Sequence, residues 1–211
     1  MHTTHSTIYL STPVSDAAAA VSKLSACLSD VNAWLSCSRL RLNASKTHVM
    51  WLGSSQLIDM LEVPVTSARV TVSDTARDLG VIIDSRLIMA DHVAAVCRSC
   101  YYQLRQLRSV ARSLSAEAVK EVVHAFISSR LDYCNSLVTG VNDGLLRPVR
   151  RLQSVQNAAA LLVTGTRRCE HITLALRQLH WLPVRQRIQY KLASLAFRAL
   201  SHNRQLPCIH D

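Results

Sequence analysis

The apolar residues beyond Asp84 recur at steps of three and four positions, and this spacing constrains the fold more than any other feature of the sequence. Such a period places apolar side chains along one face of an α-helix. Ser115 is suited to cap a helix N-terminus, Gly165 to end a helix, and Pro183 to interrupt one. The pattern therefore predicts four or five amphipathic helices joined by short loops, at about 93–107, 115–131, 145–164, 173–179 and 184–200.

The first 83 residues have a different pattern. From Ser15, a suitable N-cap, apolar residues at helical spacing between Val21 and Leu35 predict one long helix. A β-prone run lies at 8–10, and three further runs predict strands, at 47–52, 69–72 and 79–83. We therefore expect an α+β, mainly α protein, with a small sheet and one long helix in residues 1–83 and a basic helical bundle in residues 84–211.

The net charge of +10 lies entirely in the second part, where 18 basic residues accompany 8 acidic ones, whereas the first 83 residues hold six of each. A basic surface of this size suits a polyanion, because each neutralised phosphate releases counterions. A solvated surface without a partner is the alternative. The bases gather on helix faces and after Gly165, as Arg105, Arg108 and Arg112; Arg147, Arg150 and Arg151; Arg167 and Arg168; and Arg185, Arg187 and Lys191.

The cysteines and the N-terminus bear on the compartment. Seven cysteines, an odd number, lie mostly within helical patterns, and the chain has no secretory signal. No apolar run approaches the roughly 20 residues that span a bilayer. We expect a cytoplasmic or nuclear protein that is neither secreted nor inserted in a membrane, with reduced, buried thiols.

Two cysteine clusters are candidate metal sites, and the first of them is also a candidate redox pair. Cys97 and Cys100 lie one helical turn apart, downstream of His92, but an apolar pattern surrounds them, so core packing is the preferred interpretation. Cys208 and His210 lie near the chain end with too few further ligands, which favours a frayed tail. We predict no metal site.

Four phrases occur in a fixed order. They are Trp34 followed by Leu-Arg-Leu-Asn-Ala-Ser-Lys-Thr at 40–47, Leu-Gly-Val at 79–81, Ser-Arg-Leu-Asp-Tyr-Cys-Asn-Ser-Leu at 129–137, and His-Trp-Leu-Pro-Val at 180–184. Together they resemble the downstream part of the reverse transcriptase of non-LTR (LINE-type) retrotransposons, over about residues 8–207. In that family the first phrase follows the Tyr-Ala-Asp-Asp strand of the palm, the second forms the primer grip, and the last two lie in the thumb. The resemblance implies a palm remnant at 1–83 and a thumb-like domain at 84–211.

The same resemblance places the catalytic Asp pair of the family at Thr4 and His5. Nucleotidyl transfer needs carboxylates that hold two Mg²⁺ ions, and Thr and His are poor ligands for this cation. The resemblance covers only the downstream part of the enzyme, so we expect no counterpart in this chain of the fingers or of the first catalytic carboxylate of the family. We therefore expect no RNA-directed DNA polymerase activity and no cofactor for this chain by itself. Mg²⁺ is expected only in the full-length enzyme of the family. The missing palm and fingers segments are a candidate partner in trans.

Several positions that contact substrates in the family fall within the chain. Lys46 resembles a lysine near the incoming nucleotide, a weak candidate for a general acid, and its alternative is a solvated turn lysine. Gly80 resembles the primer-grip glycine that lets nucleic-acid backbone come close, and its alternative is a glycine at a strand bulge. The basic residues of the helices would contact the phosphates of an RNA/DNA hybrid or template–primer duplex. For Trp181 the two alternatives are stacking on a base and packing against the bundle. The phrase Asp-Tyr-Cys-Asn at 132–135 is expected to have a structural role in the packing of the thumb.

The sequence leaves three interpretations open. The first is a truncated reverse transcriptase of a retrotransposon that is inactive alone. The second is a non-catalytic nucleic-acid-binding module derived from the thumb. The third is a relic open reading frame without function.

Overall fold

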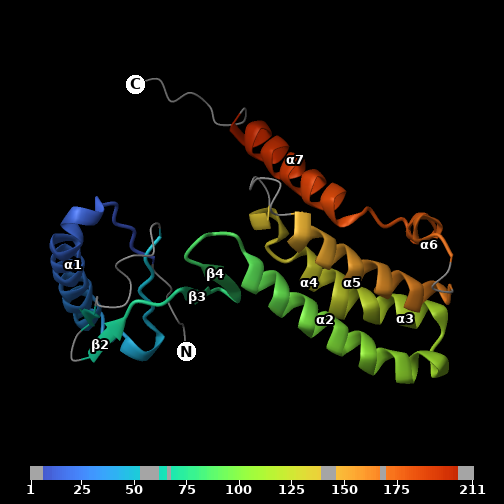
Figure 1. Cartoon of the computed structure of the whole chain (residues 1–211), viewed down its shortest axis with the longest axis horizontal. Helices are drawn as coiled ribbons and strands as arrows, with labels where there is room; N and C mark the ends of the chain where they lie inside the picture. The colour runs from blue at the N-terminus through green and yellow to red at the C-terminus, as the bar shows by residue number, and fades with distance from the viewer. Residues whose placement is uncertain (1–6, 53–61, 66–67, 139–145, 167–169, 204–211) are drawn as a thin grey trace. The chain divides into compact units, whose positions relative to one another are not determined.

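A computed structural model of the chain describes residues 7–52, 62–65, 68–138, 146–166 and 170–203. The fold is mainly helical, with two small antiparallel sheets (Figure 1). The chain divides into two compact units, Met1–Leu87 and Ile88–Asp211. Within the described ranges, no helix combines the length and the apolar character needed to cross a membrane.

The first unit contains the long helix expected near the N-terminus. Helix α1 (Ala17–Cys37) follows a 3₁₀ turn, η1 (Val14–Asp16). The capping prediction was wrong, because the Ser15 hydroxyl donates a hydrogen bond to the Asp16 carboxylate at 3.2 Å and α1 has no side-chain cap. Leu28 of α1 is buried and packs in one small core with Val63. The apolar stripe thus holds α1 to the strand that contains Val63.

Four strands form two separate antiparallel hairpins. Strand β1 (Glu62–Val65) pairs with β2 (Ala68–Thr71), and β3 (Thr75–Asp78) pairs with β4 (Val81–Asp84). The predictions at 69–72 and 79–83 correspond to β2 and β4, but β1 and β3 were missed. The run at 47–52 was wrongly predicted as a strand, since its β contact is one bridge from Val49 to Val72, and the run at 8–10 is exposed coil.

The turn between β3 and β4 explains the conformation of Gly80. Leu79 and Gly80 form a two-residue turn with φ values of 46° and 85°. Positive φ at both positions matches the right-handed twist of the flanking strands, and glycine adopts it without strain. Both residues were expected within a strand from 79 to 83, so the structure moves them into the turn and rules out the strand-bulge alternative for Gly80.

The second unit is a helical bundle. Its elements are α2 (Ala90–Val110), η4 (Ala111–Ser113), α3 (Ala116–Val123), the π-helical segment η5 (His124–Ser128), α4 (Ser129–Asp132), η6 (Asn135–Val138), α5 (Leu146–Thr164), α6 (Ile172–Gln178) and α7 (Val184–Asn203). Helices α2, α3, α4 and α5 lie side by side in Figure 1. The five predicted helical stretches are all present.

The sequence signals at helix ends are confirmed in this unit. The Ser115 hydroxyl accepts the N–H of Ala118 at 3.3 Å and caps α3. Gly165 follows α5 with φ of 67°, the left-handed conformation of a C-terminal stop. In the π-helical segment Phe126 is 45% exposed, although we expected it in the buried stripe. A wider π turn rotates the residues that follow relative to an α-helical pattern, which accounts for this difference.

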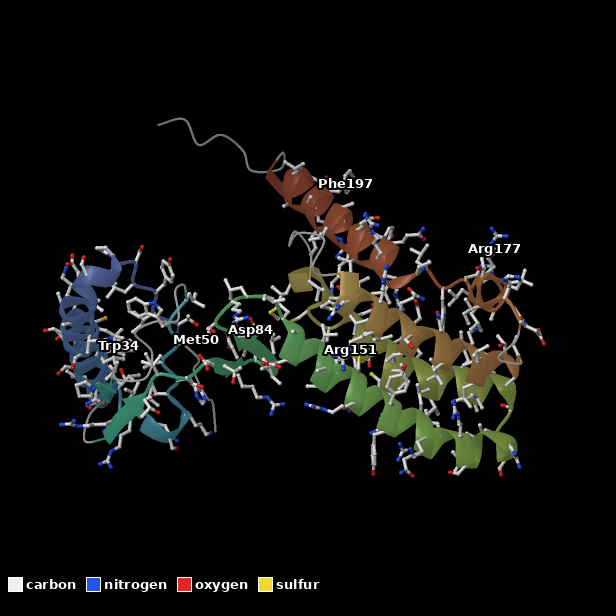
Figure 2. The ribbon with its side chains drawn as sticks, viewed as in Figure 1. Trp34, Met50, Asp84, Arg151, Arg177 and Phe197 are labelled. Carbon is white, nitrogen blue, oxygen red and sulfur yellow. The ribbon has the colours of Figure 1, made fainter. Side chains whose placement is uncertain are left out.

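The core of the bundle joins α2, α3, α5 and α7. Cys97 and Cys100 are buried in it, which confirms core packing for this pair, and His92 beside them is also buried. Cys27 and Cys37 of α1 are exposed, so the expectation of buried thiols was wrong for these two. The second half of α7 also departs from a fully amphipathic helix, since Phe197 is 71% exposed (Figure 2).

Candidate functional site

An open groove of about 420 Å³ lies between α2 and α5. Its lining consists of Cys97, Arg98, Tyr101, Tyr102, Arg105, Arg151 and Ser154. Arg151, labelled in Figure 2, belongs to the second turn of α5. The groove thus combines three cationic side chains with two aromatic rings.

Helical spacing brings the α2 residues of the groove together. Arg98, Tyr102 and Arg105 follow one another at steps of four and three, so they occupy one face of the helix. Tyr101 lies beside them and donates its phenolic hydrogen to the Ser154 hydroxyl of α5 at 2.9 Å. This hydrogen bond links the two helices across the groove and fixes the position of the Tyr101 ring.

The groove has a strongly one-sided charge. Its lining has three guanidinium groups and no carboxylate. Within the described parts of the chain, Arg98, Arg105 and Arg151 form no ion pair with an acidic residue. Burial raises the pKa of the Cys97 thiol, an effect that the nearby Arg151 opposes. Cys97 is therefore a neutral, apolar part of the groove at physiological pH.

Two of the arginines that were predicted to contact phosphates line the groove, and the other predicted residues lie elsewhere or outside the described residues. Arg105 and Arg151 meet in the groove. Four further arginines are exposed on the same helices or their ends but do not line the groove, namely Arg108, Arg112, Arg147 and Arg150. Arg167 and Arg168 lie outside the described residues. The arginines thus form one groove with additional positive charge around it.

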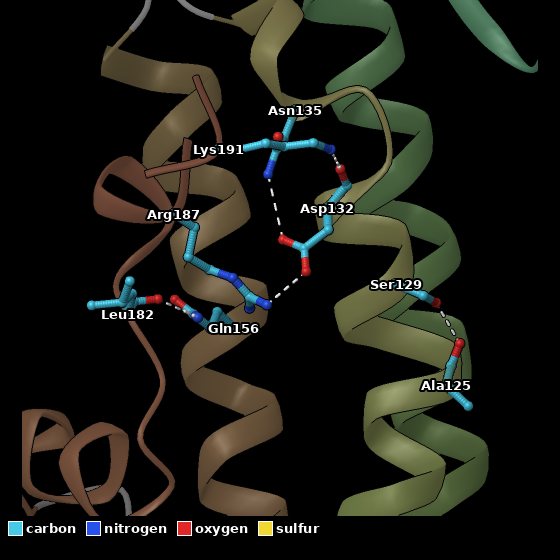
Figure 3. A network of polar contacts seen from close by, with 8 residues as sticks. All are labelled: Ala125, Ser129, Asp132, Asn135, Gln156, Leu182, Arg187 and Lys191. Atoms are coloured by element: carbon cyan, nitrogen blue, oxygen red, sulfur yellow. Dashed lines mark hydrogen bonds and ion pairs between the residues drawn. The ribbon is translucent and has the colours of Figure 1, made fainter. Parts of the chain in front are cut away.

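The predicted contacts on α7 have a different setting. Arg185 is exposed in the first turn of this helix. The Lys191 ammonium donates to the Asp132 backbone carbonyl at 2.7 Å, and the Arg187 guanidinium contacts the Asp132 carboxylate at 2.6 Å (Figure 3). Asp132 also accepts a bond from the Asn135 amide at 3.4 Å. These contacts give Asp132 and Asn135 the structural role expected for their phrase and tie Lys191 to it.

The last of the four phrases is docked on α5. The buried Gln156 amide donates to the Leu182 carbonyl at 2.9 Å, and Gln153 accepts the N–H of Val184 at 2.8 Å (Figure 3 shows the first contact). Trp181 packs against the bundle core, which agrees with the packing alternative and not with stacking on a base. The fourth phrase therefore contacts α5, and the third phrase contacts α7 through Asp132.

The candidate residues of the first unit lie at turns. Lys46 ends the 3₁₀ turn η2 (Ala44–Lys46) and is exposed. The Asn43 side chain accepts bonds from the Ser45 N–H at 3.0 Å and the Ser45 hydroxyl at 2.6 Å, and its backbone carbonyl accepts the Thr47 hydroxyl at 2.9 Å. The phrase thus builds a compact turn that presents Lys46 to solvent. Gly80 occupies the separate β3–β4 turn.

Four groove residues were absent from the sequence-based candidates, and one of them is Ser154 of α5. Arg98, Tyr101 and Tyr102 lie on α2, off its buried stripe. A signal was present, because Arg98 and Arg105 flank two tyrosines at helical spacing and aromatic residues interleaved with bases are typical of nucleic-acid-binding surfaces. What the sequence lacked was the opposite wall, which α5 supplies.

The described part of the chain contains no group of three or more His, Cys, Asp or Glu residues arranged to hold a metal ion. Thr4 and His5, where the resemblance places the catalytic Asp pair, lie outside it, as do Cys208 and His210.

Comparisons of the chain with protein-family models, with curated proteins and with solved structures find no match. The resemblance to reverse transcriptases therefore rests on the four phrases alone. The class of protein that the fold defines is a mainly helical chain with a basic, aromatic groove on its helical unit.

Proposed function

We propose that the chain corresponds to the end of the palm, the primer grip and the thumb of a non-LTR retrotransposon reverse transcriptase, and that its helical unit binds nucleic acid without catalysis. One observation carries the binding proposal. The α2–α5 groove collects Arg98, Arg105 and Arg151 around two tyrosines and has no carboxylate in its lining.

The chemistry of the groove favours phosphate. A guanidinium group presents a planar fork of N–H donors that matches two phosphate oxygens, and such charge-assisted bonds are stronger than neutral ones. Arg98 and Arg105 lie about two turns apart on α2, so together they follow a backbone rather than a single ion. Phosphate contacts of this kind carry little sequence information, so we propose binding that is largely independent of base sequence.

The start of α5 supports the same proposal. Arg147 lies in the first turn of α5, where the helix dipole is positive, and Arg150 and Arg151 follow in the second turn. Positive side chains at this end oppose helix stability, whereas an anion there is favoured. Their presence is best explained by a negatively charged partner, which we propose is the template–primer duplex of the family, an RNA/DNA hybrid.

Catalysis is not part of the proposal. Thr4 and His5 stand where the resemblance requires two aspartates, so the chain alone is proposed to be inactive as an RNA-directed DNA polymerase. Purified protein with Mg²⁺ or Mn²⁺ is expected to extend a primer on an RNA template no further than buffer does. Extension above that level would contradict the proposed inactivity but would leave the binding proposal intact.

A salt titration tests the binding. The affinity for an RNA/DNA hybrid is expected to fall steeply as salt rises, because each phosphate contact contributes roughly 0.9 to the slope of log K against log salt. The triple variant Arg98→Gln, Arg105→Gln, Arg151→Gln is expected to reduce that slope by about 3. A matched control removes three exposed charges elsewhere, as Lys23→Gln, Arg177→Gln and Arg198→Gln, and is expected to change it little. Absence of binding at low salt, or equal loss in both variants, would contradict the proposal.

A further inference from the structure

The two tyrosines of the groove add a property that phosphate binding does not require. Tyr101 is 42% exposed and Tyr102 is 59% exposed, although both line the hollow between α2 and α5. The bond from the Tyr101 hydroxyl to Ser154 holds that ring in place on the groove wall. The groove therefore presents aromatic surface that the core of the bundle does not cover.

The cations are placed on both sides of these rings. Along α2, Arg98 precedes each tyrosine by about one helical turn, and Arg105 follows each tyrosine by about one turn. Arg151 lines the opposite wall on α5. A planar group seated on a tyrosine thus has a guanidinium within reach at either end, which matches a base between its two flanking phosphates.

The volume of the hollow is large enough for a single base. Its volume of about 420 Å³ falls in the range of roughly 300–1,000 Å³ found for small-molecule sites. The bases of a duplex keep their faces stacked on one another and offer a protein only edges and phosphates. An aromatic platform gains a partner only where a base is unpaired, and base–aromatic stacking tolerates any base because each has a π-face.

We infer that the α2–α5 groove binds an unpaired nucleotide of a single-stranded nucleic acid, with the base stacked on the tyrosines and the flanking phosphates held by Arg98, Arg105 and Arg151. This inference rests on the proposed nucleic-acid binding and deepens it. The tyrosines of the groove distinguish a single-stranded segment from a duplex, whereas the arginines inside and outside the groove contact the phosphates of both.

The test uses the full chain and a short single-stranded oligonucleotide that carries 2-aminopurine, beside the same oligonucleotide in a duplex. Binding of the single strand is expected to quench the 2-aminopurine fluorescence through stacking. Tyr102→Ala is expected to weaken single-strand binding by roughly 5- to 100-fold, since stacking on an aromatic side chain makes about that difference per base. Duplex binding by the same variant is expected to stay within about twofold of the unsubstituted chain.

Two further variants separate the ring from other causes. Tyr102→Phe keeps the ring and is expected to retain single-strand binding and quenching. Tyr190→Ala removes a tyrosine of α7 that is 69% exposed and lies away from the groove, and it is expected to change neither affinity. Circular dichroism of each variant confirms that the helices are intact, so a loss of binding reports on the site.

The outcomes distinguish this inference from the proposal beneath it. Equal losses for single strand and duplex in Tyr102→Ala, or no loss for either, would overturn the unpaired-nucleotide inference. If the arginine triple variant still weakens hybrid binding in that case, the proposed phosphate binding stands. Failure of the unsubstituted chain to bind either nucleic acid at low salt would remove the proposed function itself.

Discussion

The Arg187 guanidinium of α7 contacts the Asp132 carboxylate at the end of α4 at 2.6 Å, although 55 positions of sequence separate the two residues (Figure 3). Asp132 is 38% exposed and Arg187 is 20% exposed, so the pair lies at the edge of the bundle. With the Lys191 bond to the Asp132 carbonyl, it fastens α7 to the end of α4.

Substitution Asp132→Asn is expected to destabilise the helical unit by about 1 kcal/mol, because it removes the anion that faces a partly buried guanidinium. A lower midpoint in urea unfolding with an unchanged m-value would show this. The control Glu117→Gln breaks an exposed ion pair with Lys120 at 3.4 Å and is expected to cost only about 0.3 kcal/mol. Equal effects of the two substitutions would show that the Asp132 contact is no stronger than a surface pair.

The buried Cys100 predicts a loss of stability in alkali. Burial raises the pKa of its thiol from the ordinary 9.0 to about 11, outweighing the opposite effect of nearby Arg130. Between these pH values the unfolded chain releases the thiol proton and the folded chain keeps it. The contribution of the thiol to the free energy of unfolding is therefore fully present below pH 9.0 and is lost as the pH rises through about 11. The variant Cys100→Ala is expected to show a smaller fall in unfolding free energy over this window, by roughly 3 kcal/mol. Parallel pH profiles for both chains would contradict this.

The φ of 85° at Gly80 predicts a graded response to substitution. An added Cβ meets no atom within 4 Å, so the cost of Gly80→Ala is conformational and is expected to be about 1 kcal/mol. Gly80→Asn is expected to cost less, since asparagine tolerates the left-handed region. Thermal unfolding measures both. If Gly80→Asn folds normally yet weakens hybrid binding, the close approach of nucleic acid implied by the primer-grip resemblance is supported; unchanged binding would remove it.

Limited proteolysis tests the division of the chain at Leu87. Arg86 is exposed between β4 and α2, and the two compact units meet in the sequence one residue later. Brief trypsin treatment is therefore expected to yield a fragment that begins at Leu87 and contains the helical unit, identified by mass spectrometry. Arg105 and Arg108, within the hydrogen-bonded turns of α2, are expected to be cut much more slowly. Cleavage at α2 arginines as fast as at Arg86 would contradict this division.

The helices were predictable because their signals are local. Apolar spacing of three and four, a hydroxyl at Ser115 and a glycine at 165 act within a few residues, and all three agree with the structure. The strands were less predictable. Strand β3 has the sequence Thr-Ala-Arg-Asp, which lacks an apolar alternation, and it is a strand because β4 supplies its hydrogen bonds.

The helices of the second part, its charge imbalance and the arginine stripes were predictable, because each follows from residue type and spacing along the chain. Two other features depend on packing between helices: Arg105 and Arg151 line one groove with Tyr101 and Tyr102, and Lys191 and Arg187 contact Asp132. A helical pattern in the sequence specifies only which side chains share a face of one helix. Which face of α2 meets which face of α5 depends on how their apolar side chains pack together.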